Sequence, residues 1–367
     1  MLPARPLLAL ATCFSIVPVG ASAQTRDTIV ARDGRRIGVD EVLADTFREV
    51  RYRLASREAA IPAAEVERIE YRDEPLPLRQ AREKLSAGDP DAALRLLEIE
   101  TSGARPWVAE AVAFERANAL EQWGTIDPRR YEEAASAYDA FGKQFAESRR
   151  LPEALLGRAR SLASSTRRDE ALAAFEGVAS RSEDFGFEVQ IRALLGRAET
   201  LLAMGRTAEA RGETRGLETR IQAMNHQGEA FAPYLSRARL LQGDAMLAEG
   251  NADEARRFFS SLAQEGPAKN PWLYYGARTG EGEALLRLSK PREAILSLSE
   301  VVALEPYGFP FSARATYDLG ECWKALIGIE SEAERRAQSY WSDVLKLYPG
   351  TPWSAKARVA LGPSAPK

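Results

Sequence analysis

The chain has 367 residues, of which 28% are charged and 45% hydrophobic. This balance excludes a disordered chain and an integral membrane protein, and the length exceeds what one ordinary compact core occupies. The formal net charge is only −3 and no basic face is evident, which argues against a nucleic acid as partner. The length suits a leader, a small domain and a repeat array.

Residues 1–23 are predicted to be a cleaved secretory signal peptide. Arg5 gives a positive start, the run from Leu7 to Val19 is nearly all apolar, and Ala21-Ser22-Ala23 is an A-x-A cleavage site. We therefore expect cleavage before Gln24 and secretion across the inner membrane into the periplasm.

The two cysteines bear on the fate of the leader and on disulfide bonding. Cys13 lies inside the leader, where a weak lipoprotein box ends on it; lipidation there and an uncleaved anchor are the two alternatives to simple cleavage. Cys322 then remains alone, so the exported chain has no internal disulfide and we expect a buried, inert thiol. No later segment has the length of a membrane span, so no transmembrane segment is expected in the mature chain.

Residues 24–75 are predicted to form a small β-rich domain. Thr28–Ala31 leads into Asp33-Gly34, a dipeptide typical of hairpins. Ile37 and Val39 follow on the return strand, which Val42 could extend. Alternating or β-branched side chains indicate further strands at Val50–Leu54, Ile61–Pro62 and Val66–Tyr71. Five short strands favour an SH3-like or Sm-like barrel. This domain either caps the helices that follow or binds separately, and both roles stay open.

Internal repeats are the strongest signal in the sequence. The hexapeptide at residues 154–159, ALLGRA, returns unchanged at 193–198. The second helix of each predicted helical pair opens on an alanine: Ala93, Ala134, Ala171, Ala210, Ala255, Ala294 and Ala337. Four residues later stands a bulky side chain in most units: Leu97, Tyr138, Phe175, Phe259, Leu298 and Trp341. Thr214 is the exception, so we expect the fourth unit to be the least well packed.

The first helices carry a matching pattern. Each has one small residue at the equivalent position: Ala81, Ala117, Ala159, Ala198, Gly243, Gly282 and Gly320. A small residue lets the paired helix approach, and a large residue on the neighbouring turn fills the groove beside it. Pro267, Pro306 and Pro349 each follow a second-helix alanine by twelve residues, where a proline ends the helix.

These features together resemble the tetratricopeptide repeat. The resemblance implies a mainly α protein, with a right-handed α-solenoid of about seven helical pairs over residues 76–362 and a flexible tail at 363–367. Units of 36 to 45 residues exceed the 34 of the family, so longer connections are expected, for example at Gly124–Arg130, Gly216–Pro233 and Gly328–Glu332. The segment Leu347–Ala357 resembles the closing helix of bacterial periplasmic proteins of this family, of the outer-membrane-assembly and cell-division-coordinator kind. Some of those also carry a small β domain first.

Few residues suggest catalysis. The chain has a single histidine, His226, in a polar stretch, and neither a metal-binding cluster nor a phosphate-binding or dinucleotide motif is recognisable. We expect no enzyme, no cofactor and no metal. A carboxylate-dependent cell-wall hydrolase is the least favoured alternative, because acids are plentiful and two could pair in the concave face.

One set of charged residues is predicted to face the concave side of the solenoid. Acids follow the small residue of four first helices, and arginines stand two turns earlier on three of them: Glu199, Asp244, Glu283 and Glu321, with Arg192, Arg237 and Arg314. Tyr317 would add an apolar contact. Two interpretations stay open, a ladder of ion pairs between repeats and a groove that binds an extended peptide.

The predicted function is an exported scaffold that binds a protein or peptide partner in the periplasm or cell envelope, with possible association with outer-membrane or cell-wall proteins. A self-associating structural subunit of an envelope complex is the alternative.

Overall fold

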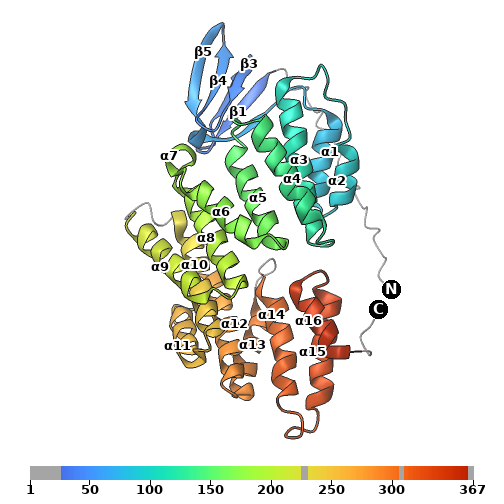
Figure 1. Ribbon diagram of the computed structural model, residues 1–367, viewed down its shortest axis with the longest axis vertical. Helices are drawn as coiled ribbons and strands as arrows, with labels where there is room; N and C mark the ends of the chain where they lie inside the picture. Colours follow the sequence, from blue (N-terminus) through green and yellow to red (C-terminus); the bar gives the residue numbers. More distant parts are fainter. Residues whose placement is uncertain (1–25, 225–229, 306–309, 363–367) are drawn as a thin grey trace, which may run out of the picture.

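Figure 1 shows a computed structural model of the chain, which describes residues 26–224, 230–305 and 310–362. The expected leader with Cys13, the cleavage site before Gln24, His226, Pro306 and the tail at 363–367 lie outside these residues. In the described part of the chain, six strands come first and helices follow.

The β-rich part consists of two three-stranded antiparallel sheets. Their strands are β1 (Asp27–Ala31), β2 (Arg36–Val39), β3 (Glu41–Asp45), β4 (Glu49–Leu54), β5 (Arg57–Pro62) and β6 (Val66–Glu70), with a short 3-10 helix at Ala63–Glu65. One sheet has the order β2-β1-β6 and the other β3-β4-β5. The hairpin turn between β1 and β2 places Gly34 at φ +84°, a conformation that favours glycine.

The expected closed barrel does not form. No strand pairing joins the two sheets in the part of the chain that is described, and the strands there number six rather than five. The chain leaves the first sheet at Asp40, so Val42 lies in β3 instead of extending the return strand. The sheets meet instead through apolar side chains, because Ile29, Val39 and Val50 are fully buried between them.

The helices follow as seven antiparallel pairs, which confirms the mainly α repeat architecture. The pairs are α1 (Leu76–Ser86) with α2 (Pro90–Leu96), α3 (Pro106–Gly124) with α4 (Arg130–Gln144), α5 (Leu151–Ser164) with α6 (Arg168–Ala179), α8 (Phe187–Ala203) with α9 (Thr207–Gln222), α10 (Ala232–Ala248) with α11 (Ala252–Ala263), α12 (Pro271–Arg287) with α13 (Pro291–Leu304), and α14 (Phe311–Lys324) with α15 (Ala333–Leu347). One turn, α7 (Ser182–Phe185), precedes α8.

The repeated small and bulky residues form the contacts between helices. Every alanine that opens a second helix is at most 2% exposed. The ring of Phe175 on α6 lies directly on Gly196 of α8, where an added Cβ would sit 2.4 Å from Phe175 Cε1. Thr214 takes the bulky position in the fourth pair and is itself buried, and Leu217 and Ile221 on later turns of α9 supply the apolar core there.

The last helix, α16 (Pro352–Leu361), covers the end of the array, as the closing segment predicted. Thr351 caps its N-terminus by accepting a hydrogen bond from the Ser354 amide at 3.2 Å. Ala357 is fully buried against α15, and Trp353 packs on Tyr317 of α14 with ring centroids 5.6 Å apart.

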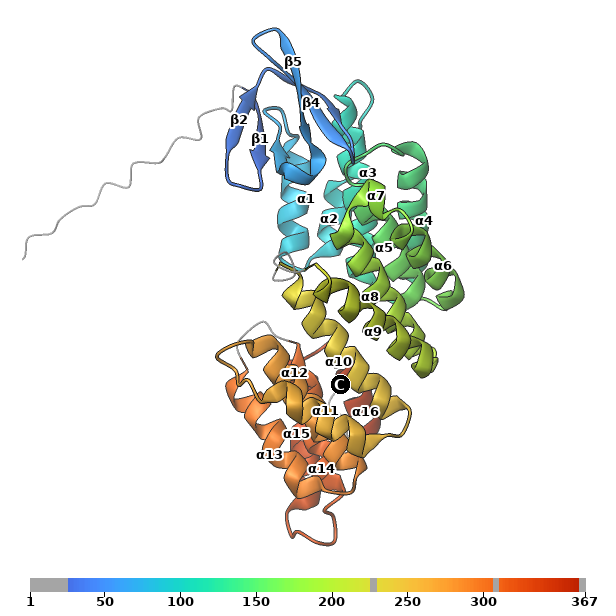
Figure 2. The ribbon, with the colours of Figure 1, turned by 90° about the vertical axis from the view of Figure 1, so that its left-hand side faces the viewer.

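The β strands lie along one edge of the array rather than over its apolar end (Figures 1 and 2). Asp27 of β1 accepts a hydrogen bond from Arg105, just before α3, at 2.8 Å. Asp45 of β3 pairs with Arg149 before α5 at 2.6 Å. Phe47 packs edge-on against Phe185 of α7, with ring centroids 5.4 Å apart. The sheets therefore touch three successive units.

Candidate partner-binding groove

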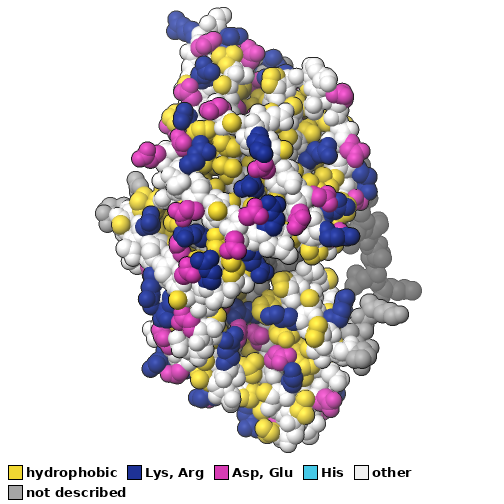
Figure 3. All heavy atoms as spheres, viewed as in Figure 1, with side chains coloured by type: hydrophobic (Ala, Val, Ile, Leu, Met, Phe, Trp, Pro, Cys, Tyr) yellow, Lys and Arg dark blue, Asp and Glu magenta, His cyan; other side chains and the backbone are white. Residues whose placement is uncertain are grey.

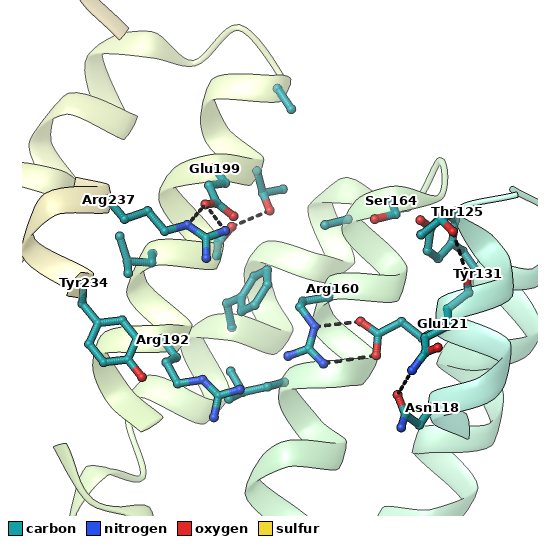
Figure 4. A pocket seen from close by; sticks show the side chains of 18 residues that line it. Asn118, Glu121, Thr125, Tyr131, Arg160, Ser164, Arg192, Glu199, Tyr234 and Arg237 are labelled. Carbon is teal, nitrogen blue, oxygen red and sulfur yellow. Dashed lines mark hydrogen bonds and ion pairs between the residues drawn. The ribbon is translucent and has the colours of Figure 1, made fainter. Parts of the chain in front are cut away.

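A pocket of about 640 Å³ opens along the first helices of four consecutive pairs, α3, α5, α8 and α10 (Figure 4). These helices contact one another in sequence, because each first helix packs on the first helix of the next pair. The repeat pattern places an apolar floor beneath polar walls. Leu156, Phe175 and Leu195 form part of the floor and are almost fully buried.

Ion pairs between neighbouring first helices line this pocket. Arg160 Nε on α5 lies 2.7 Å from Glu121 Oε1 on α3, and Arg237 Nε on α10 lies 2.6 Å from Glu199 Oε1 on α8. Each arginine therefore binds an acid of the preceding pair. Figure 4 shows both pairs across the pocket.

Arg192 on α8 follows the same rule. Its Nη2 lies 2.6 Å from Glu153 Oε2 on α5, and Glu153 also accepts a hydrogen bond from Arg160 at 3.2 Å. Tyr234 of α10 lies at the same end of the pocket and donates its hydroxyl hydrogen bond to Glu188 at 2.8 Å. The pocket is thus lined by a ladder of ion pairs between neighbouring first helices and, at one end, by the aromatic ring of Tyr234.

A second charged cluster lies further along the array and is mostly buried. Arg314 on α14 binds Asp244 on α10 at 3.1 Å and Glu283 on α12 by a shorter contact. Asp318 Oδ2, one turn along α14, lies 3.8 Å from Arg314 Nε and has no hydrogen-bond partner among the described residues. Three carboxylates thus share one buried guanidinium.

The pKa values in this cluster follow from burial and from Arg314. Burial raises the pKa of Asp318 to about 7, and it also raises the pKa of Asp244. Burial acts in the same direction on Glu283, but Arg314 and Arg287 outweigh it, so the pKa of Glu283 is lowered. Asp318 is therefore a group of the cluster that changes charge near neutral pH.

Tyr317 and Glu321 lie beyond this cluster, beside α16. Burial raises the pKa of Tyr317 to about 12, and Lys356 of α16 lies 5.9 Å from the centre of its ring. Glu321 pairs with Lys324 on its own helix at 3.4 Å. Tyr317 belongs to the closing contact with α16, and Glu321 accepts a hydrogen bond from its hydroxyl; neither side chain lines the pocket.

The family model of the tetratricopeptide repeat matches residues 279–325, which run from α12 through α14. A crystal structure of a tetratricopeptide repeat protein from Parabacteroides merdae is similar to this chain, with a TM-score of 0.54 and 16% identity over 78% of this chain and 98% of that one. The fold is that of a tetratricopeptide repeat array. The apo form of RapI gives a TM-score of 0.47 at 12% identity, over 78% of this chain and 80% of that one, too low to support an argument. No curated protein matches the chain.

The eight predicted site residues of this tetratricopeptide array fall into three places. Arg192, Glu199 and Arg237 line the pocket. Asp244, Glu283 and Arg314 form the mostly buried cluster, Tyr317 packs on Trp353 of α16, and Glu321 bonds the Tyr317 hydroxyl. Arg237 does not pair with Asp244 of its own helix, because Asp244 is held by Arg314 from two pairs later.

Sequence reasoning missed Glu121, Glu153 and Arg160 as members of the ladder. A signal for two of them was present in the repeated hexapeptide of the tetratricopeptide array. Glu153 precedes its first copy and Arg160 follows it, whereas Arg192 precedes the second copy and Glu199 follows it. Equivalent positions in adjacent units therefore carry opposite charges, which is the pattern required for pairing between neighbouring helices.

Neither a metal site nor a membrane span is found in the part of the chain that the structure describes. Within residues 26–224, 230–305 and 310–362, histidine, cysteine and acidic side chains do not gather in groups of three suited to a metal ion. No described helix combines the length and the apolar character that crossing a bilayer requires. Cys322 is fully buried, and burial raises the pKa of its thiol to about 12.

Proposed function

We propose that this protein is a scaffold that binds a partner protein, and that the groove of α3, α5, α8 and α10 holds an extended segment of that partner. The observation that carries the proposal is the open pocket on the first helices, with an apolar floor and charged walls. The tetratricopeptide fold, which generally mediates protein–protein interaction, supports it.

The groove has the physical character of a peptide site. Its arginines are already held in place by acids of the preceding helix, so binding would cost little of their side-chain entropy. The half-buried rings of Tyr131 and Tyr234 offer apolar contact, while Asn118 and Gln122 on α3 bring amides that can bond a peptide backbone. A rigid surface of this mixed kind favours an extended segment over a small apolar molecule.

Photo-crosslinking from single positions tests the proposal. A photoreactive amino acid at Thr125 or Ser164, both exposed and lining the pocket, is expected to capture a partner in cells. The matched control is the same amino acid at Leu296 on α13, which is 72% exposed and outside the pocket. Capture from Leu296 at equal yield, with none from the groove, would show that another face binds.

We also propose that the chain acts outside the cytoplasm, in the periplasm or cell envelope. The apolar run and the A-x-A site of residues 1–23 support this. Mass spectrometry of the protein from a periplasmic extract is expected to give a chain that begins at Gln24. A chain that begins at Cys13 with an added lipid mass would support the lipoprotein alternative, and an intact leader in the cytoplasmic fraction would contradict export.

A further inference from the structure

β5 stands at the outer edge of its sheet, at the end of the molecule opposite to α15 (Figures 1 and 2). Its pairing with β4 runs from Leu54–Arg57 to Glu49–Pro62 without a bulge. Within the described residues, no hydrogen bond joins its outer side to another segment. Proteins usually protect such an edge with a bulge or a covering segment, because a free edge pairs readily with another strand.

The hairpin turn decides which backbone groups of β5 face outward. Residues 55–56 form a two-residue turn in which both φ values are positive, as in a type I′ hairpin. Leu54 and Arg57 beside this turn are therefore a hydrogen-bonded pair, and bonded and non-bonded pairs alternate from there. It follows that the N–H and C=O groups of Glu58 and Ala60 point away from β4.

The other edges of the two sheets are less open than β5. β3 contains a bulge, and the segment before α5 covers its end, since the Arg149 N–H donates to the Asp45 carbonyl at 3.2 Å. β6 carries the charged side chains of Glu67, Arg68 and Glu70, and β2 is only four residues long. β5 instead exposes two adjacent alanines, Ala59 and Ala60, which leave its edge sterically accessible.

The edge of β5 is complementary to itself in one register. In an antiparallel pair of two copies, Glu58 opposite Ala60 of the second copy lets both residues exchange their N–H···O bonds, and the twofold axis repeats this pair. A shift that sets Glu58 opposite Glu58 brings like charges together. The opposite shift sets Pro62 opposite Glu58, where a donor is missing because proline has no N–H.

Side chains on both faces fit this register. Arg51 of β4 lies opposite Ala60, so Glu58 of the second copy would come next in the same row, and Arg51 can reach it across the alanine methyl group. Both charged side chains are available, since Arg51 is 56% exposed and Glu58 is 64% exposed. On the other face Ala59 would meet Ala59 of the second copy, between the two Tyr52 rings.

We propose that two copies of this chain associate through β5 to form one continuous antiparallel sheet with the strand order β3-β4-β5-β5-β4-β3. Because the two β5 strands run in opposite directions, the two helical arrays extend away from each other and both grooves stay open. The contact is small, so we expect a reversible dimer that forms in the micromolar range. It is independent of the groove, whose lining comes from helices α3 to α10.

Sedimentation velocity of the purified chain from Gln24 to Lys367 tests the proposal. From about 1 μM to about 200 μM the chain is expected to shift from monomer to dimer. Amide exchange at residues 57–61 should slow over the same range, since the Glu58 and Ala60 amides become bonded. Arg51→Glu and Glu58→Arg each set like charges in both facing rows, so each variant is expected to weaken the dimer about fivefold or more.

An equimolar mixture of the two variants tests the register. One Arg51→Glu chain and one Glu58→Arg chain restore an opposite-charge pair in both rows, so the mixture should dimerise more tightly than either variant and nearly as well as the wild type. Arg257→Glu on α11, at a side chain that is 68% exposed, is the matched control and should leave the dimer unchanged. Unchanged melting temperatures confirm that the variants fold.

Three outcomes would overturn the proposal. A chain that stays monomeric throughout the range forms no such dimer. A dimer that neither variant weakens is held by another face. A mixture that dimerises no better than its components excludes the facing of residues 51 and 58. Crosslinking from Thr125 or Ser164 in the groove can succeed in all three cases, so the proposed function is tested separately.

Discussion

Arg314 on α14 lies 3.1 Å from Asp244 on α10, which belongs to a helical pair two units earlier in the chain. The contact passes over α12, whose Glu283 binds the same guanidinium. In a repeat array most contacts join nearest neighbours, so a side chain that ties three units together adds cooperativity where it stands.

Replacing Arg314 should therefore destabilise the C-terminal units strongly. Arg314→Ala leaves Asp244 and Glu283, both mostly buried, without their shared cation. Breaking a fully buried ion pair costs about 3–5 kcal/mol, which sets the upper limit of the expected loss. Urea unfolding followed by circular dichroism measures the change. Arg287→Ala is the control, because the Arg287 side chain is 44% exposed and should cost much less. Equal urea concentrations at the midpoint of unfolding for the two variants would contradict the prediction.

Asp318 should make stability depend on pH. Its pKa is raised from its ordinary value to about 7 in the folded chain, so the folded state holds this proton more tightly than the unfolded state does. The free energy of unfolding that it contributes is therefore largest at acid pH and falls as pH rises from about 4 to about 7. The groups facing Asp318 are Arg314 and Glu321 of its own helix, Glu283 of α12 and Lys356 of α16.

The measurement compares the wild type with Asp318→Asn over this range. The difference in unfolding free energy between the two chains should move in favour of the variant by on the order of 1 kcal/mol or more by pH 8. Because every other titrating group is present in both chains, its contribution largely cancels. A difference that stays constant from pH 4 to pH 8 would show that Asp318 does not titrate in this interval.

A pair of glycine substitutions separates packing from helix propensity. Gly196→Ala places a Cβ against Phe175, and overpacking of a core contact costs about 1–3 kcal/mol. Gly212→Ala lies inside α9 with nothing within 4 Å of the added Cβ, so it should stabilise the helix by about 0.5–1 kcal/mol. Thermal melts of the two variants are expected to shift in opposite directions; a shift in the same direction would refute the packing role of Gly196.

The contact between the β sheets and the helices should depend on Phe47. Phe47 is 8% exposed and meets Phe185, while its backbone N–H donates to the Glu147 carbonyl at 3.1 Å. In Phe47→Ala, amide exchange at residues 46–49 is expected to rise because this edge opens more often. Leu54→Ala, at a side chain that is 37% exposed on β4, is the matched control. Unchanged exchange in Phe47→Ala would mean that the polar contacts alone hold the sheets.

The repeat signal predicted the helical part because its information is local. An alanine such as Ala171 and a ring such as Phe175 lie on one face of one helix, and their spacing alone indicates a packed pair. The longer connection after Gly124 was also predictable, because α3 ends there and α4 starts at Arg130. Short-range periodicity thus accounts for the units and for their order.

The sheets and the ion pairs depend on partners distant in sequence, which periodicity does not specify. Val42 follows the expected return strand closely, yet it pairs with Tyr52 in a separate sheet. Arg237 and Asp244 share a helix, but their partners come from α8 and α14. Which of several equivalent acids an arginine meets is decided by how neighbouring units rotate against each other, and no residue spacing encodes that angle.

The β sheets brace the early units along one edge, while Arg314 clamps α10, α12 and α14 to one another. Two stiffened halves therefore meet between α8 and α10, and Thr214 leaves the fourth pair there without a large side chain at its repeat position. We expect bending of the whole molecule to concentrate at that joint. The groove crosses this joint between α8 and α10, and the Arg237–Glu199 ion pair spans it. A rigid segment bound in the groove would therefore restrict bending at the joint.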